Sequence, residues 1–189
     1  MAYPTLAQVK ARLGIGDTSE DTTITQVLNS AITTAEKYTG RLFVAATATR
    51  EFRADAPYVT GDKRRLNLFA DLHALTTLTN GDGTVIAALD YYLFPWEAPY
   101  YEVQLAVDSG LFFNSISQRI SVAGNWGYSS TCPADVFQAI IDLAHYLYFG
   151  VHSGTGGANL QASRQTGLIV APDQIPPKIV SVLDLYRRR

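Results

Sequence analysis

The segment 35–43, AEKYTGRLF, ends one long amphipathic helix and leads directly into sequence with strand character. Before it, apolar side chains recur at steps of three and four, which predicts one apolar helix face over about four turns. These side chains are Ile24, Val27, Leu28, Ala31, Ile32, Ala35 and Tyr38. Gly40 stands where a helix can end in the left-handed conformation, because glycine has no Cβ to clash. Arg41 adds a cation beside the carbonyls of the last turn. We therefore expect a core helix that stops close to Thr39.

A shorter helix is expected at the beginning of the chain. Thr5 is a suitable N-cap for a helix that extends to Leu13 and ends at Gly14. The acidic run 17–21, DTSED, predicts a turn followed by the N-terminus of the long helix, where carboxylates are favourable.

Helical periodicity returns at Pro133, which is expected at the first helical position, with Thr131 or Cys132 as the cap. Asp135 lies near the positive end of this helix. Gly150 is expected to stop it. The apolar stripe is broad, which is typical of a central core helix, and consists of Val136, Ile140, Leu143, Ala144 and Leu147. After Pro176 and Pro177 a last helix is expected, whose apolar face comprises Ile179, Val182, Leu183 and Tyr186.

Between the helical ends, residues 44–131 alternate apolar and polar side chains, which predicts five to seven short strands. The clearest turn is 80–83, Asn-Gly-Asp-Gly, between two strand-like flanks, and it predicts a hairpin. Because strands separate the two helical regions, we expect an α+β fold. Residues 1–43 and 132–189 would form a discontinuous helical bundle, and residues 44–131 an inserted antiparallel β-rich subdomain.

Composition limits the possible environments and partners. The 189 residues carry a formal net charge of −2, so no overall field attracts DNA or an acidic membrane. A lone cysteine, Cys132, fits a reducing cytoplasm. Neither a signal peptide nor an apolar run of about 18 residues is evident, so we expect a soluble protein. Eleven tyrosines favour a role with protein interfaces.

Catalytic and cofactor patterns are weak. His145 follows Asp142 by three residues on one predicted helix, and Cys132 lies at a helix N-terminus, where a thiol pKa can fall. Neither has a partner that would complete a nucleophilic site, and zinc-ligand spacing is missing. The glycines of segment 150–165 lack the strand and Gly-Lys-Ser/Thr pattern of a phosphate loop. We therefore expect no enzyme, metal or cofactor.

Two basic clusters lie at 63–65 and 187–189. Each could bind phosphate or an acidic protein surface, or could be exposed to solvent without a binding role.

The order of these features resembles the head–tail connector proteins of tailed bacteriophages, the adaptor or head-completion proteins of the gp6-like group. The resemblance lies in segments 24–43, 66–93 and 122–148, which include YTGR, the hairpin, DYYL, WGY and the CPAD helix. Its structural signature comprises Tyr38, Gly40, Arg41, Pro133 and Asp135.

This resemblance implies a virion structural protein of the neck, assembled in the host cytoplasm. Such adaptors form a closed ring of about twelve copies below the portal protein. The ring extends the channel through which double-stranded DNA passes without sequence-specific binding, and it offers a platform to the next neck or tail-completion protein. A membrane partner is not expected.

The last helix and its arginines suggest a portal contact through Ile179, Val182, Leu183, Tyr186, Arg187, Arg188 and Arg189. The loop 150–165 is expected to become ordered only in the ring. Two alternatives stay open: another neck or tail-completion protein, or a small hydrolase assembled from residues such as Asp142, His145 and Cys132.

Overall fold

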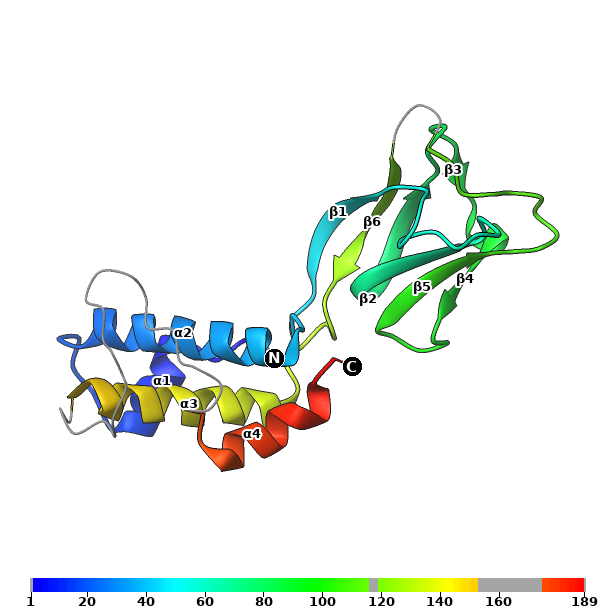
Figure 1. The fold of residues 1–189 in the computed structure, drawn as a ribbon. Coiled ribbons are helices and arrows are strands. Elements are labelled where there is room, and N and C mark those ends of the chain that lie inside the picture. The colour runs from blue at the N-terminus through cyan, green and yellow to red at the C-terminus, as the bar shows by residue number, and fades with distance from the viewer. Residues whose placement is uncertain (1, 116–118, 153–174, 189) are drawn as a thin grey trace. The chain divides into compact units, whose positions relative to one another are not determined.

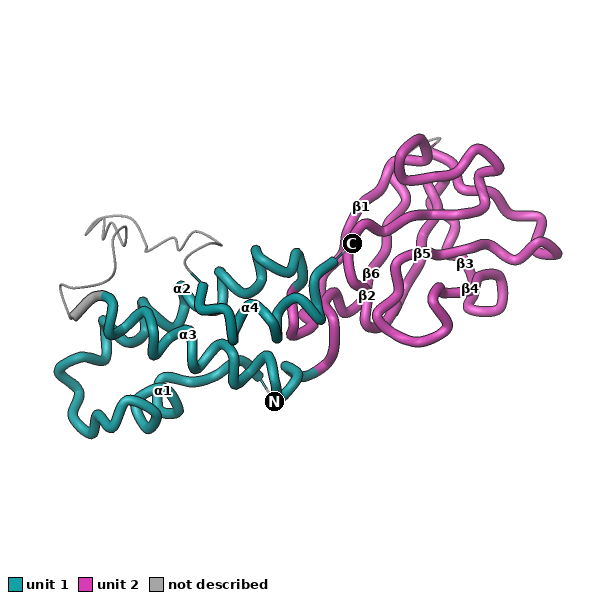
Figure 2. The backbone as a smooth tube through the Cα atoms, turned by 60° about the horizontal axis from the view of Figure 1, so that its bottom comes forward, with its two compact units in different colours: residues 1–41, 131–189 teal, residues 42–130 magenta. Residues whose placement is uncertain are grey.

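The computed structural model describes residues 2–115, 119–152 and 175–188. Figure 2 shows two compact units, one built from residues 1–41 and 131–189 and the other from residues 42–130. The first unit is helical and the second contains the strands (Figure 1). The predicted α+β fold class, a bundle from both ends of the chain with an antiparallel β-rich block between them, is confirmed.

The helical unit contains α1 (Leu6–Leu13), α2 (Asp21–Thr39), α3 (Ala134–His152), α4 (Pro177–Leu183) and the 3-10 turn η3 (Asp184–Tyr186). Helix α2 packs along α3, α1 contacts both of these helices, and α4 packs mainly on α3. The apolar stripes predicted for α2 and α3 supply the core between them, which includes Ile24, Ala31, Val136, Ile140, Leu143 and Leu147.

Both predicted glycine stops near the N-terminus are present. Gly14 and Gly40 adopt the left-handed conformation, with φ of 73° and 68°, and cap α1 and α2. Thr5 is the N-cap of α1, and its backbone N–H donates to Gln8 Oε1 at 2.8 Å. Local residue chemistry therefore determines three of these four helix ends, since the N-cap of α2, Glu20, makes no side-chain capping bond.

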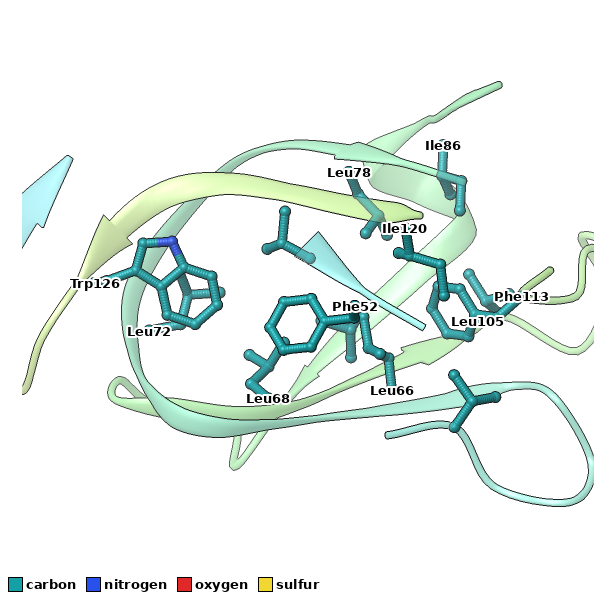
Figure 3. Packing of buried hydrophobic residues seen from close by; sticks show 13 residues of the cluster. Phe52, Leu66, Leu68, Leu72, Leu78, Ile86, Leu105, Phe113, Ile120 and Trp126 are labelled. Carbon is teal, nitrogen blue, oxygen red and sulfur yellow. The ribbon is translucent and has the colours of Figure 1, made fainter. Parts of the chain in front are cut away.

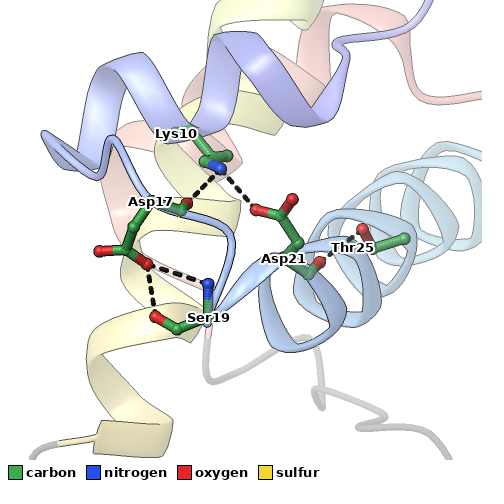
Figure 4. A network of polar contacts seen from close by, with 5 residues as sticks. All are labelled: Lys10, Asp17, Ser19, Asp21 and Thr25. Atoms are coloured by element: carbon green, nitrogen blue, oxygen red, sulfur yellow. Dashed lines mark hydrogen bonds and ion pairs between the residues drawn. The ribbon is translucent and has the colours of Figure 1, made fainter.

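The turn between α1 and α2 is held by the acidic run predicted to form it (Figure 4). Lys10 Nζ bonds the backbone oxygen of Asp17 and lies 2.5 Å from Asp21 Oδ1. The Asp17 carboxylate accepts bonds from the hydroxyl and backbone N–H of Ser19. These bonds from Ser19 lower the pKa of Asp17, because they favour the ionised carboxylate.

Two details of α3 differ from the prediction. The helix begins at Ala134, one residue after Pro133, whose carbonyl accepts the N–H of Phe137. It also continues through Gly150 to His152. A helical glycine costs only about 1 kcal/mol relative to alanine, so a well-packed helix can pass through it. Most of the loop predicted at 150–165 lies outside the described residues, which resume at 175.

The β unit contains β1 (Ala46–Phe52), β2 (Arg65–Thr79), β3 (Val85–Ile86), β4 (Tyr91–Phe94), β5 (Tyr100–Leu105) and β6 (Ile120–Trp126), with a 3-10 turn η1 (Ala88–Asp90) before β4. The strand order is β1-β6-β2-β5-β4, every neighbouring pair is antiparallel, and β3 pairs with the end of β2. Strand β2 is long enough to pair with β5 through its first half and with β6 through its second half.

The concave side of this curved sheet encloses a second core (Figure 3). Leu66, Leu72 and Trp126 are almost completely buried there, and the Phe52 ring lies 6.1 Å from that of Trp126. Strand β6 shows the period of two expected for strands most clearly, because its buried residues alternate with partly buried ones along its whole length.

The predicted hairpin is present, with Leu78 opposite Ile86 across the turn. Asn80 in this turn is 3% exposed and fixes it to the segment before β6. Its Nδ2 donates to the Phe112 carbonyl at 2.9 Å, and its Oδ1 accepts the Asn114 N–H at 3.0 Å. Because both the amide nitrogen and the oxygen of Asn80 are hydrogen-bonded, its burial stabilises the turn instead of destabilising the fold.

Among the described residues, none of the helices is both apolar enough and long enough to traverse a lipid bilayer.

Candidate functional site

Two sets of residues that the sequence singled out separately lie together with Asp184 at one end of the helical unit. We call this group the C-terminal cluster and define it as Tyr38, Arg41, Asp135, Asp184, Tyr186 and Arg187. Tyr38 and Arg41 come from the end of α2, Asp135 from the first turn of α3, and the rest from η3 and the residue after it.

Hydrogen bonds between side chains connect η3 to both long helices. The Tyr38 hydroxyl donates to Asp184 Oδ1 at 2.6 Å, and the Tyr186 hydroxyl lies 2.9 Å from both carboxylate oxygens of Asp135. Hydrogen bonds to charged groups are among the stronger ones in proteins. The two tyrosines therefore fix the end of the chain to α2 and α3.

The backbone of the tail is held as well. Arg41 Nε donates to the Tyr186 carbonyl at 2.6 Å, and the Arg188 N–H donates to the Thr39 carbonyl at 2.9 Å. Arg41 was expected to neutralise the carbonyls at the end of its own helix. The structure directs its guanidinium to a carbonyl of η3, so it also positions the tail.

The electrostatics of the C-terminal cluster favour the protonated form of Tyr38. The bond to Asp184 is the main cause that raises the pKa of Tyr38, because removing the phenol proton would place two negative charges side by side. The Arg187 guanidinium lies 5.6 Å from the centre of the Tyr38 ring, within the range of a cation–π contact.

The predicted portal-contact residues divide into two groups. Ile179 and Leu183 are 5% and 0% exposed, so they belong to the core of the helical unit and are not a free docking face. They are buried because α4 covers α3 with its apolar side. The portal contact predicted for them stays a prediction. Val182, Tyr186 and Arg188 are partly buried, Arg187 is exposed, and Arg189 lies outside the described residues.

Sequence reasoning missed Asp184 and Thr39, which each hold part of the tail. Tyr38 and Asp184 are 146 residues apart, so no local pattern links them. The structure also shows Leu185 at 79% exposure between two bonded residues. An apolar side chain in that position was not part of the predicted face.

The residues considered for hydrolysis are not arranged for it. Cys132 is buried and burial raises its pKa to about 11, which leaves the thiol neutral. Asp142 bonds Gln138 at 3.0 Å and lies 3.6 Å from Arg12 Nε, while the His145 ring packs on Phe149. From the start of α3 to His145 is about 17 Å at 1.5 Å per residue, so Cys132 and His145 cannot act together.

The basic cluster at 63–65 is partly used inside the β unit. Arg64 Nη1 donates to the Ala106 carbonyl at 3.2 Å and its guanidinium lies over the Phe112 ring. Arg65 Nε is 3.8 Å from Glu102 Oε1. Across the described part of the chain, no group of three or more His, Cys, Asp or Glu side chains could hold a metal ion.

Comparison with known proteins finds a likeness to phage-type connector proteins over about the first third of the chain. Residues 3–62 match the family model described as phage gp6-like head-tail connector protein. No curated protein sequence matches the chain.

Several solved structures share its fold. One, titled neck of an empty GTA particle computed with C6 symmetry, gives a TM-score of 0.62 at 18% identity and covers 98% of this chain and 90% of that one. A native GTA neck computed with C12 symmetry gives a TM-score of 0.61 at 18% identity, and the match covers 97% of this chain and 88% of that one. The virion of a native gene transfer agent particle gives a TM-score of 0.61 at 20% identity, and the match covers 100% of this chain and 93% of that one.

At these identities the likeness establishes the fold. Together with the family match it supports a structural protein of a phage-type neck, and the resemblance of this chain to gp6-like head–tail connectors is confirmed.

Proposed function

We propose that this protein is a head–tail adaptor in the neck of a phage-type virion. It forms a ring of about twelve copies below the portal, extends the channel through which DNA leaves the head, and presents a platform to the next neck or tail-completion protein. The observation that carries the proposal is the connector-family match over residues 3–62, which contain α1, α2 and two members of the C-terminal cluster, Tyr38 and Arg41.

The structural neighbours support the ring. The neck of one of them was computed with C12 symmetry and that of another with C6 symmetry. A ring of identical subunits needs head-to-tail contacts that close by rotation, in which one surface of each copy binds a different surface of the next.

The charge of the chain suits a channel wall. A formal net charge of −2 provides no overall attraction to phosphate. A protein that holds many phosphates binds DNA tightly, whereas a channel must let the genome move. DNA therefore passes through the ring without sequence-specific binding.

The role is structural rather than catalytic. The separation of Cys132 from His145, the neutral thiol of Cys132 and the pairing of Asp142 with Gln138 support this proposal. Among the described residues, we find no observation that favours the hydrolase alternative.

Within this role we assign the portal contact to the exposed part of the C-terminal cluster and its neighbour, namely Leu185 and Arg187. Leu185 is an exposed apolar side chain on a segment that four bonds hold rigidly to α2 and α3. A rigid apolar contact beside a cation binds with little loss of conformational freedom. The buried Ile179 and Leu183 support this surface from beneath.

The test is co-sedimentation of the purified protein with DNA-filled heads that carry the portal and lack this protein. The unmodified chain should bind and should appear as a ring at the portal vertex by electron microscopy. Replacing the exposed cation, Arg187→Glu, should weaken binding at least tenfold. Lys178→Glu is the matched control, because the same charge change is made at a side chain of α4 that is 87% exposed.

The outcomes separate the two parts of the proposal. If the unmodified chain neither binds the heads nor forms rings on them, the adaptor role is refuted. If it binds and Arg187→Glu binds as well as Lys178→Glu, the adaptor role stands and the assigned portal contact is wrong. Circular dichroism of both variants establishes that the helices are intact.

A further inference from the structure

The sheet of the β unit is open, and its two outermost strands differ in chemistry. Within the described residues, β1 pairs with β6 alone and β4 pairs with β5 alone. Each outer strand therefore has a row of backbone groups without a strand beside it. Such edges are templates for pairing with another chain, and natural proteins usually protect them with charges or by covering them.

Strand β4 is apolar on both faces. Leu93 lies opposite the buried Val103 on the core side. On the outer side, Tyr92 and Phe94 lie opposite Gln104 and Glu102, the polar residues expected on a solvated face.

Just beyond β4, Trp96 adds a third ring to the outer side. Its centroid is 6.1 Å from that of Tyr92 and 4.8 Å from that of Phe94. The Trp96 side chain is 71% exposed and that of Tyr92 46%. We call Tyr92, Phe94 and Trp96 the aromatic edge. Exposed clusters of Trp and Tyr are typical of the energetic centres of protein interfaces.

Strand β1 presents small and polar side chains. Phe52 points into the core, whereas Thr47, Thr49 and Glu51 lie on the outer side and are exposed. We call these three residues the threonine edge. Aromatic and β-branched side chains on adjacent strands form favourable pairs, so the two edges are complementary in side-chain type.

The strand directions determine how the two edges can join. Five strands in a row with antiparallel neighbours leave β1 and β4 running in the same direction. Rotation about an axis roughly along the strands therefore brings β4 of one copy beside β1 of the next as a parallel pair. In such a pair Glu97, just after β4, and Arg53, just after β1, lie at the same end of the two strands, where Arg53 also pairs with Asp55 of its own chain at 2.9 Å. Both side chains are exposed, and their charges are opposite.

We propose that the aromatic edge of one copy packs against the threonine edge of the next copy, so that the sheets continue from subunit to subunit around the ring. This inference rests on the proposed ring and names one of its subunit contacts. It uses two different surfaces of the same chain, as a closing head-to-tail contact requires. Burial of the three rings also explains why β4 can be apolar on its outer face.

Disulfide trapping tests the contact. In a Cys132→Ser background, the double variant Phe94→Cys and Thr49→Cys is assembled on portal-bearing heads and oxidised. A contact of this kind gives a ladder of covalent oligomers in denaturing electrophoresis. Variants with cysteines at 92 and 47, or at 96 and 51, test the same register, and pairs displaced by two residues test its neighbours. The control combines Phe94→Cys with Thr76→Cys, an exposed position on the central strand β2.

A second measurement does not depend on register. Trp96→Ala should reduce ring assembly on the heads at least tenfold. Val85→Ala is the matched control, because its side chain is 64% exposed on β3, which pairs with β2 and with neither outer strand. The edge contact is refuted if Trp96→Ala forms rings normally and no cysteine pair gives a ladder of covalent oligomers. The adaptor role is unaffected by that result. Heads that recruit no ring of the unmodified chain refute the adaptor role, and the edge contact with it.

Discussion

Replacing Gly81 with alanine tests whether the hairpin turn is packed as closely as the structure indicates. A Cβ atom at this position would lie 2.0 Å from the Asn114 carbonyl oxygen and 2.6 Å from Ser115 Cα, both backbone atoms. Ordinary contact begins at 3.4 Å, so the two segments must separate by about 1.4 Å. Backbone atoms cannot move aside as a flexible side chain can.

That separation has a cost that can be estimated from the neighbouring bonds. Overpacking in a close-packed region costs about 1–3 kcal/mol. The same movement breaks the two bonds that Asn80 makes to Phe112 and Asn114, and these contribute about 1 kcal/mol each. Gly81→Ala should therefore lower the free energy of unfolding of the β unit by about 3–5 kcal/mol.

Urea unfolding followed by tryptophan fluorescence measures this change directly, since Trp96 and Trp126 both lie in the β unit. Gly61→Ala is the control, because a Cβ there meets no atom within 4 Å and its φ needs no glycine. The control should stay within about 0.5 kcal/mol of the unmodified protein. Equal stabilities of the two variants would show that the turn is not closely packed against Asn114.

Three further predictions concern the helical unit and the division of the chain. Because the pKa of Tyr38 is raised, its bond to Asp184 should persist below pH 10 and be lost as the pH rises through that higher pKa; ultraviolet titration of the unmodified protein and Tyr38→Phe should differ by one late-titrating phenol. Cys132 should react with a thiol reagent at pH 8 at least a hundredfold more slowly than in denaturant, since its pKa is about 11 and its side chain is buried; comparable rates would contradict that burial. Residues 42–130, expressed alone, should show cooperative unfolding by fluorescence, whereas a gradual loss of signal would mean that they are not an independent domain.

Local residue chemistry was sufficient to predict three of the four ends of α1 and α2 and the hairpin. Gly14, Gly40 and the Asn-Gly-Asp-Gly turn each act through the conformations that a single residue prefers, and these preferences need no knowledge of the rest of the chain. The change from a helical period to a strand period predicted the fold class for the same reason. Gly150 is the exception, because packing along α3 outweighs the small helical cost of a glycine.

The C-terminal cluster could be predicted only in part. Tyr38, Arg41 and Asp135 stood out for their places at helix ends, and Arg187 for its charge. Their meeting with Asp184 depends on the packing of α4 on α3, which no sequence pattern specifies. The same packing buries Leu183. Periodicity identified an apolar face on the last helix but could not show that the face is covered by this chain itself.

The division of the helical unit between the two ends of the chain has a consequence for its synthesis. Helices α1 and α2 are synthesised before residues 42–130, and their main partner α3 follows only after them. The strands in that interval contact one another and can complete their own core before α3 has been synthesised to cover the apolar stripe of α2. A nascent chain therefore carries α1 and α2 with their apolar faces uncovered until α3 has been synthesised, and this exposed apolar surface favours aggregation at that stage.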